Sequence, residues 1–372
     1  MNTIPHITRT DRRRALAAAM AAHGIERLVL ASTGLHMIDL PNPLLHLTGF
    51  RSIGPALVTF DRHGDITAMV MPADDAGRAA RHFGGDAAGV DEATDILGHM
   101  SSAPHTATVG FGALPHRLAG SITARLGEDA RSFDDAFYAA TSPKLHEEIT
   151  AASRATAIAE AGYEHMKALI RPGLRECDLA VAVNLFMKAQ GADDSFLMLN
   201  AGPRADAVMP SSERPLEEGD LILVELSPSV EGQFVQICRT VAIGEPAPEI
   251  APGYELLVQA MRAGISKVKP GVRMGEICGA IDDLLSEAGF AQYSRPPFIR
   301  RRGHGLGAGS THPGDVAVDN DTALEAGMVF IVHPNQFLPT TGYMMCGEPL
   351  VVGEAGPLVL SSREARLDVV TP

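Results

Sequence analysis

The segment Arg300–Asp315 reads RRRGHGLGAGSTHPGD and holds a dense group of side chains that could do chemistry. His304 lies between two glycines, and His312 follows it eight residues later. A glycine-rich loop that binds phosphate leads directly into a helix, whereas turn-forming residues follow this segment and the pattern GxxxxGK[ST] is absent. The glycines instead predict a close backbone bend that presents histidine, whose imidazole exchanges protons near neutral pH and binds metals.

Four further polar side chains lie within or beside apolar runs. Glu225 interrupts the run LILVELSP, and His333 follows the run GMVFIV. Gln236 and Cys238 are two residues apart in QICRT, so on a strand they share one face. A buried glutamate suits a proton acceptor or a partner for a cationic group. A cysteine acts as a nucleophile only beside a group that lowers its pKa, and otherwise it is a small core residue.

Bulk composition excludes several classes of protein. Hydrophobic residues make up 45% and charged residues 20% of the 372 residues, which is typical of soluble globular proteins. A net charge of −14 argues against general binding of nucleic acid, which needs a basic surface. We find no transmembrane run, no signal-peptide pattern and no CxxC spacing among the four cysteines. We therefore expect a cytoplasmic protein that acts on a small molecule and binds neither nucleic acid nor membrane.

The hydrophobic pattern predicts two domains. Residues 1–141 alternate helical and strand signals and predict an α/β domain, with strands at 27–32, 55–61, 66–74 and 106–112. Ser142 and Pro143 suit the start of a helix. From there to residue 372 we expect an α+β layer, with helices at 177–191, 253–268 and 274–289 and strands at 221–230, 233–244, 327–334 and 348–353. The predicted fold class is α+β in two domains, residues 1–141 and 142–372.

Six segments, in this order, resemble the pita-bread (M24-type) hydrolases: NPLLHLTGF, SPKLHEEI, RPLEEGDLILVEL, QICRTVAIGEP, GHGLGAGSTH and LEAGMVFIVHP. That family includes methionine aminopeptidase, proline-specific aminopeptidases, prolidase and creatinase. The resemblance covers nearly the whole chain and implies an N-terminal creatinase-like domain before a C-terminal pita-bread catalytic domain. It also implies a homodimer in which the segment Asp39–Phe50 contributes to the site of the partner subunit.

The resemblance also implies where a two-metal site would lie. The metallopeptidases of the family bind two ions through two aspartates, one histidine and two glutamates. By position these ligands fall on Glu225, Gln236, His304, His333 and one of Cys346, Gly347 or Glu348. A second family histidine, which handles substrate and protons, matches His312. Two divalent ions need several carboxylates to offset their mutual repulsion, and too few remain, so we predict that the two-metal centre is absent.

The sequence thus predicts a metal-independent, creatinase-like hydrolase without a cofactor, which cuts an amide, amidine or lactam-like C–N bond in a small nitrogen-containing metabolite. The creatinase site itself does not transfer, because its catalytic histidine and a substrate-binding glutamate fall on Val208 and Cys238. The predicted catalytic residues are His304, His312, Glu225 and His333. The predicted substrate-binding residues are Gln236, Cys238, Glu348 and Arg302, the last as a candidate for a substrate carboxylate.

Two alternatives stay open at this point. The first is a mononuclear zinc or iron hydrolase, aminopeptidase-like, with His304, His333 and Glu225 as ligands and Glu348 or Cys346 nearby. The second is a binding or scaffold protein that has kept the fold after loss of catalysis. The sequence leaves open whether Cys238 is a nucleophile or a core residue, and it does not name the substrate.

Overall fold

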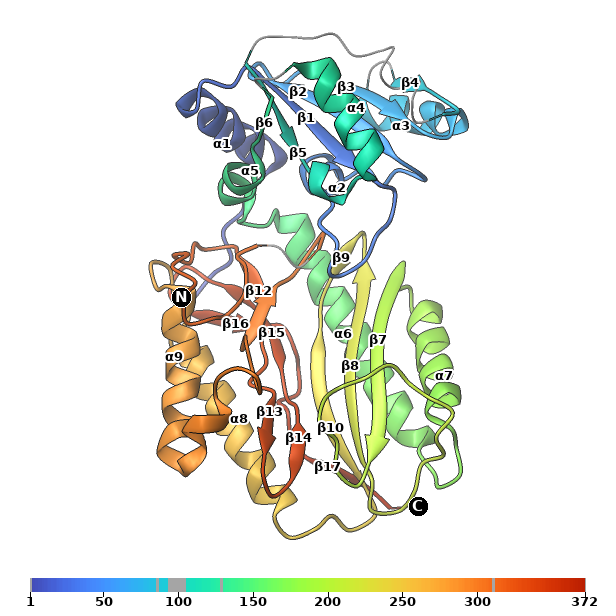
Figure 1. Ribbon diagram of the computed structural model, residues 1–372, viewed down its shortest axis with the longest axis vertical. Coiled ribbons are helices and arrows are strands. Elements are labelled where there is room, and N and C mark those ends of the chain that lie inside the picture. Colours follow the sequence, from blue (N-terminus) through green and yellow to red (C-terminus); the bar gives the residue numbers. More distant parts are fainter. Residues whose placement is uncertain (1, 85–86, 93–104, 128–129, 310–311, 372) are drawn as a thin grey trace. The chain divides into compact units, whose positions relative to one another are not determined.

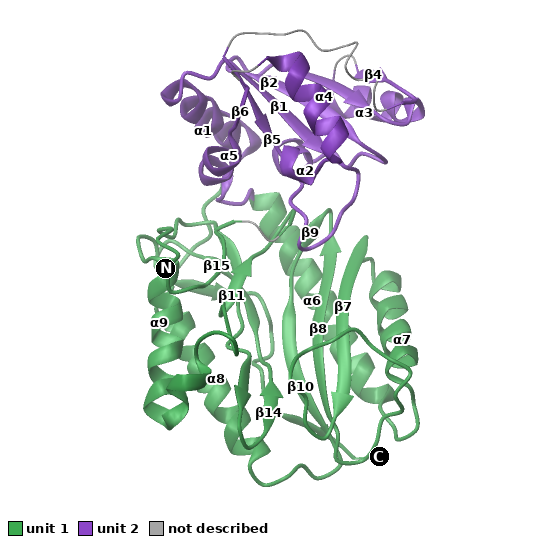
Figure 2. Cartoon of the chain, viewed as in Figure 1, with its two compact units in different colours: residues 1–6, 146–372 green, residues 7–145 purple. Residues whose placement is uncertain are grey.

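The chain folds into two compact units (Figure 1, Figure 2). The computed structural model describes residues 2–84, 87–92, 105–127, 130–309 and 312–371. The smaller unit is Ile7–Leu145, and the larger unit combines His146–Pro372 with the first residues, Met1–His6. Helices and strands occur in both units, which confirms the predicted α+β class with an α/β part near the N-terminus.

The smaller unit is built on one mixed sheet with the strand order β4-β3-β2-β1-β5-β6. Central β1 (Arg27–Ser32) is antiparallel to β2 (Ala56–Asp61) and parallel to β5 (Thr106–Val109). The other elements are β3 (Ile66–Val70), β4 (Ala87–Gly89), β6 (Arg131–Ser132), α1 (Arg9–Ala22), α2 (Pro43–Thr48), α3 (Ala76–Phe83), α4 (His116–Leu126) and α5 (Asp134–Thr141). Leu28 and Leu30 pack in one core with α1, while Val29 and Ala31 pack in another with α4. Because both faces of β1 are covered, its sequence is continuously apolar.

The segment Asp39–Phe50 contains a short helix that the sequence pattern did not predict. Asn42 caps α2, since its side-chain oxygen accepts a hydrogen bond of 3.0 Å from the backbone N–H of Leu45. Pro43 occupies the first turn, and Gly49 ends the helix with a φ of 74°. The helix is six residues long and all six are buried, so it showed no one-sided helical periodicity.

The larger unit contains two sheets and a hairpin. One sheet has the order β17-β10-β8-β7, with β9 on β8, and the second has the order β11-β12-β15-β16. The strands are β7 (Asp194–Gly202), β8 (Leu221–Val230), β9 (Gln233–Phe234), β10 (Ile237–Ile243), β11 (Gly303–Gly305), β12 (Val329–Val332), β15 (Glu348–Val352), β16 (Pro357–Val359) and β17 (Asp368–Val370). The hairpin pairs β13 (Gln336–Leu338) with β14 (Gly342–Met344). A bridge between Cys238 and Gly347 joins β10 to the strand that becomes β15, so the two sheets meet there.

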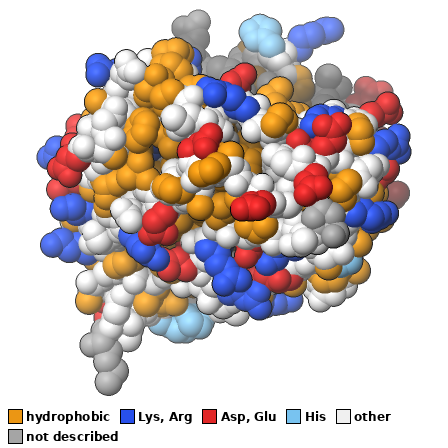
Figure 3. Space-filling view, turned by 90° about the horizontal axis from the view of Figure 1, so that it is seen from below, with side chains coloured by type: hydrophobic (Ala, Val, Ile, Leu, Met, Phe, Trp, Pro, Cys, Tyr) orange, Lys and Arg blue, Asp and Glu red, His pale blue; other side chains and the backbone are white. Residues whose placement is uncertain are grey.

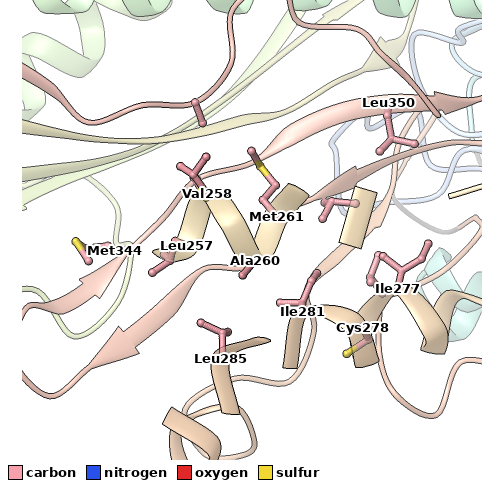
Figure 4. Packing of buried hydrophobic residues seen from close by; sticks show 14 of the residues in the cluster. Leu257, Val258, Ala260, Met261, Ile277, Cys278, Ile281, Leu285, Met344 and Leu350 are labelled. Atoms are coloured by element: carbon pink, nitrogen blue, oxygen red, sulfur yellow. The ribbon is translucent and has the colours of Figure 1, made fainter. Parts of the chain in front are cut away.

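Helices cover each sheet on one side. α6 (His146–Leu169) and α7 (Glu176–Ala189) pack on the first sheet, and α8 (Ile250–Ser266) and α9 (Met274–Leu285) pack on the second (Figure 1). Figure 4 shows Met261, Ile281 and Leu350 in the second of these cores. Gly264 lets α8 and α9 approach closely, because a Cβ there would lie 2.8 Å from the side chain of Ile281. Helices on one side leave the opposite face of both sheets for polar groups.

The surface carries both signs of charge. On the face drawn in Figure 3, acidic and basic side chains are interspersed with hydrophobic ones. Within the described part of the chain, we find no helix that combines the length and apolar character needed to cross a bilayer.

Candidate functional site

β8, β10 and Gln236, the residue just before β10, place three polar groups on one face of the first sheet. Cys238 lies directly opposite Glu225 in the antiparallel register. The Gln236 amide nitrogen donates to a Glu225 carboxylate oxygen at 3.3 Å, and the Cys238 thiol lies 3.9 Å from the other oxygen. Val224 and Leu226 point the other way, into the core beneath α6 and α7. The alternation of β8 therefore turns Glu225 away from the helices, where it is half-buried.

The glycine-flanked histidine is on a strand rather than in a free loop. Gly303, His304 and Gly305 form β11, which pairs with β12. A Cβ on Gly303 would lie 2.0 Å from the carbonyl oxygen of Ile331, and a Cβ on Gly305 would lie 2.2 Å from that of His312. No L side chain fits either gap. The glycines thus allow close backbone approach, as expected, but on a short strand, in which Gly303 has a φ of 149° that favours glycine.

His304 is 4% exposed and hydrogen-bonded through its ring. Its Nε2 lies 3.1 Å from the side-chain oxygen of Gln236, and its Nδ1 lies 3.0 Å from the carbonyl oxygen of Gly305. With the amide nitrogen of Gln236 facing the Glu225 carboxylate, its oxygen must accept, so Nε2 of His304 carries a proton. Gln236, predicted to bind substrate, therefore hydrogen-bonds Glu225 through its amide nitrogen and His304 through its amide oxygen.

His333 follows β12 and lies beside His304. The two ring centres are 5.3 Å apart, with the planes inclined by 66°. Burial, and then the nearby charges of His304 and Arg301, hold the pKa of His333 well below its ordinary value. Among the described residues its Nδ1 has no hydrogen-bond partner. At neutral pH, His333 is therefore a neutral imidazole with a buried nitrogen available for a ligand.

Gly347 is one of the three positions, with Cys346 and Glu348, on which the resemblance could place the last metal-binding glutamate. A Cβ there would lie 2.6 Å from Cβ of His333 and 3.2 Å from Sγ of Cys238, so the space for a side chain is already filled. Successive residues of a strand alternate, and Glu348 points to the opposite face. There it forms an ion pair of 2.9 Å with Arg239 and accepts a hydrogen bond from the backbone of Ala365.

Arg302 and Cys238 are committed to the interior. The Arg302 guanidinium, 1% exposed, lies 2.7 Å from Asp282 and donates to the Gln336 side chain at 2.9 Å. It ties the chain just before β11 to the start of β13 and is not directed at a substrate. Burial, and then the charge of Glu225, raise the pKa of Cys238 well above its ordinary value. Cys238 therefore stays a thiol at neutral pH, which suits a core residue rather than a nucleophile.

Tyr343 and Asn335 belong to the site and were missed from the sequence. Burial, and then the charges of Glu225 and Cys238, raise the pKa of Tyr343, while a hydrogen bond from the Asn335 side chain lowers it. The side-chain oxygen of Asn335 is buried without a partner among the described residues. The only sequence signal for these two residues was position: Asn335 lies two residues after His333, and Tyr343 lies two residues after the turn that ends at Thr341. His312 is half-buried, with its backbone packed against Gly305.

Comparison with known proteins shows the family. Residues 150–354 match the model of a family described as metallopeptidase family M24. The chain belongs to metallopeptidase family M24. The probable dipeptidase PepE of Mycobacterium tuberculosis (strain H37Rv) is 30% identical over 230 residues, 61% of this chain and 60% of that protein. The uncharacterized peptidase YqhT of Bacillus subtilis is 29% identical over 216 residues, 57% of this chain and 60% of that protein. The alignments thus span about 60% of the length of these curated relatives.

Solved structures agree with the family over nearly the full chain. The dipeptidase PepE from Mycobacterium ulcerans is 25% identical with a TM-score of 0.82, covering 99% of the M24 chain described here and 100% of its own. The prolidase from Pyrococcus horikoshii OT3 is 19% identical with a TM-score of 0.83, covering 96% and 99%, and shows a likeness of fold alone. The predicted pita-bread architecture is thereby confirmed.

The comparisons contradict the predicted metal-independent hydrolase of a small metabolite. The matching family is one of metallopeptidases, and the relatives are named as peptidases or dipeptidases, including the Xaa-Pro dipeptidase of Pyrococcus furiosus, 26% identical over 243 residues. The prediction was wrong because it rested on the replaced carboxylate ligands and not on the metal dependence that is typical of the family. The findings favour the alternative of a metal-dependent, aminopeptidase-like enzyme.

The residues of this M24 chain do not fit a centre of two ions. Gln236 supplies a neutral amide, and Gly347 has neither a side chain nor space for one. Within the described residues no three His, Cys, Asp or Glu side chains are grouped to hold a metal, since Gln236 lies between Glu225 and His304. One ion held by His304 and His333, whose ring centres are 5.3 Å apart, requires that Nε2 of His304 give up its proton and its contact with Gln236, because a neutral imidazole is the metal-binding form.

Proposed function

We propose that this M24 chain hydrolyses the peptide bond of short peptides, with one divalent ion held by His304 and His333 and with Glu225 as the nearest carboxylate. The observation that carries the proposal is His333. It stands where the family places a glutamate, and it is buried and neutral with an unpartnered Nδ1 beside His304. The names of the relatives, peptidase and dipeptidase, support the reaction class.

Each side chain has a role that follows from its contacts. When bound, a divalent ion polarises a carbonyl and lowers the pKa of water. Glu225 lies where it accepts a proton from the attacking water, and Gln236 holds the carboxylate in place. The Tyr343 hydroxyl stays protonated and donates a hydrogen bond to the oxygen that becomes negative at the scissile carbonyl. His312, half-buried beyond Gly305, is proposed to protonate the leaving amine.

Metal content and peptide cleavage test the proposal together. The purified protein is stripped with a chelator, titrated with Zn²⁺, Mn²⁺ or Fe²⁺, and assayed on alanyl-proline and alanyl-leucine. We expect about one ion per chain, and activity that appears with it. His333→Leu should abolish both ion binding and activity, whereas His333→Glu, which restores the family residue, should keep an ion. Two ions per chain, or no cleavage of any short peptide with any ion, would refute the proposal.

Assembly and location are part of the same proposal. We propose a cytoplasmic homodimer in which Asp39–Phe50 reaches the partner's site, and a small-molecule peptide as substrate. Light scattering at increasing dilution measures the mass. A monomer that remains fully active would contradict the shared site.

A further inference from the structure

The groups of the proposed ion site come from two different sheets. Glu225 and Gln236 lie on or beside strands of the first sheet, whereas His304 and His333 lie on or beside strands of the second. The hydrogen bond of 3.1 Å between Gln236 and His304 crosses from one sheet to the other. The contacts that fix the spacing of the two sheets at this point therefore also fix the geometry of the site.

Two backbone bridges join the sheets on either side of Gln236. Two residues before it, Phe234 exchanges hydrogen bonds of 2.9 and 3.1 Å with Gly307. Two residues after it, Cys238 exchanges hydrogen bonds of 3.0 and 3.3 Å with Gly347. The Gln236 amide is thus held between two points at which the sheets are hydrogen-bonded to each other.

A buried arginine on the helical side reinforces the second bridge. Arg239 follows Cys238 on β10 and points to the opposite face, where it is 4% exposed. Its Nη1 donates to the carbonyl oxygen of Cys238 at 2.9 Å and to that of Gly347 at 2.8 Å. These are the two oxygens that accept hydrogen bonds within the bridge, so the guanidinium ties the same two strands a second time. Hydrogen bonds from a charged donor are stronger than those between neutral groups.

The other terminal nitrogen of Arg239 connects the bridge to the C-terminal segment. Nη2 lies 2.9 Å from the Glu348 carboxylate and donates to the carbonyl oxygen of Arg363 at 3.3 Å. Glu348 in turn accepts hydrogen bonds from the hydroxyl of Ser361 and from the backbone N–H of Ala365, the latter 2.8 Å away. Both charges of the pair are buried, so separating them is costly and the guanidinium is held in one position.

We infer that Arg239 is a positioning residue for the site: it holds the Cys238–Gly347 bridge together and so keeps the groups of the two sheets at the distance that one ion requires. The inference rests on the proposed function. Arg239 faces the helices, so it acts on His304 and His333 only through the backbone that it binds. Loss of a group that orients metal ligands typically lowers metal affinity by about 10- to 100-fold.

Arg239→Lys tests this role with little change in charge. Lysine keeps the positive charge beside Glu348 but lacks the fork that reaches two carbonyl oxygens in a fixed geometry. We expect the affinity for Zn²⁺, measured by calorimetry on chelator-stripped protein, to fall about 10- to 100-fold. At saturating Zn²⁺, kcat for alanyl-leucine should fall while KM stays within about twofold, because the peptide contacts are unchanged. Glu348→Gln, which removes the ion pair but leaves the guanidinium, is a milder second variant and should weaken Zn²⁺ binding less.

The thiol of Cys238 reports on the bridge directly. It is buried against Gly347, whose Cβ would lie 3.2 Å from Sγ, so iodoacetamide reaches it only when the structure opens locally. In chelator, Arg239→Lys should raise its alkylation rate roughly tenfold or more, as read by mass spectrometry of the digested protein. Lys167→Met is the control, because it removes another largely buried cation of the helical layer, 3.0 Å from Asp368. It should lower stability without changing Zn²⁺ affinity or the alkylation rate.

Two results would overturn the inference. If Arg239→Lys and Glu348→Gln are less stable but bind Zn²⁺ and protect Cys238 as the wild type does, the ion pair is structural only. Faster alkylation with unchanged Zn²⁺ affinity also overturns it, because the bridge would then open without effect on the site.

Failure of the proposed function is distinguishable from failure of this inference. Should the wild type bind no ion and cleave no peptide, the proposed function fails, and the hydrogen bond between His304 and Gln236 is followed instead by the NMR signal of the His304 ring N–H in chelator. A signal lost in Arg239→Lys and kept in Lys167→Met supports the positioning role. A signal unchanged in both variants refutes it.

Discussion

Replacing Gln236 by glutamate should expose the electrostatic balance of the site. The substitution would put a second carboxylate 3.3 Å from that of Glu225, in the position that now holds a neutral amide. Two full charges at this distance repel by about 5 kcal/mol at an effective dielectric constant of 20. The protein escapes this cost by keeping one carboxyl protonated. At pH 7 that costs up to about 4 kcal/mol, because the ordinary pKa of glutamate is about 4.3.

The penalty of Gln236→Glu has a definite pH dependence. A raised carboxyl pKa means that the folded state holds a proton that the unfolded state releases, so stability falls as pH rises above about 4.3. The penalty should therefore be small near pH 4.5 and largest near pH 7. We expect a loss of about 2–4 kcal/mol at pH 7 in chelator, measured by urea unfolding.

A divalent ion should reverse the loss in this variant. With carboxylates at positions 225 and 236, an ion at a hundredfold excess over its dissociation constant stabilises the folded state by about 2.7 kcal/mol. Gln236→Leu is the control, since it removes the same hydrogen bonds without adding charge and should show no such pH dependence. If Gln236→Glu unfolds like the wild type at pH 7 in chelator and gains nothing extra from added ions, Gln236 does not lie between Glu225 and His304 in the way described.

Three further predictions concern the stability of the folded chain. Arg302→Met breaks the ion pair of a buried arginine and should lower the free energy of unfolding in urea by about 3–5 kcal/mol. Arg301→Met, the control at an exposed ion pair, should lower it by less than about 1 kcal/mol. Equal losses in the two variants would contradict the burial of Arg302. Burial raises the pKa of Asp368, but hydrogen bonds, first from Lys167, hold it below its ordinary value, so its stabilisation exists above about pH 4 and is lost at lower pH. Asp368→Asn should therefore destabilise at pH 7 and much less near pH 3. Gly347→Ala should lower the free energy of unfolding by about 1–3 kcal/mol, because the new Cβ would lie 2.6 Å from Cβ of His333. A melting temperature like that of the wild type would show that the space beside Gly347 is open.

Local sequence was sufficient to predict the boundaries of elements whose residues are nearly all buried. β1 and β8 were predicted to within the residue, because each is rich in buried β-branched and aliphatic residues and ends at a turn. β11 was not predicted as a strand, since two of its three residues are glycines that lack strand propensity. Only close contact with neighbouring backbone explains them. α2 was not predicted either, because its six residues are all buried and show no one-sided periodicity.

The sequence by itself determined the fold class, the order of the elements and the types of the groups at the family's ligand positions, because these follow from hydrophobic pattern and from residues that can be aligned. Only the tertiary structure decided which of those groups meet. Strand alternation sends Glu348 to Arg239 and leaves Gly347 facing His333. The folding of the β13–β14 hairpin places Tyr343 where burial and the charge of Glu225 raise its pKa, and it places Arg204 over Phe337. Such contacts join residues far apart in the chain, and no local pattern encodes them.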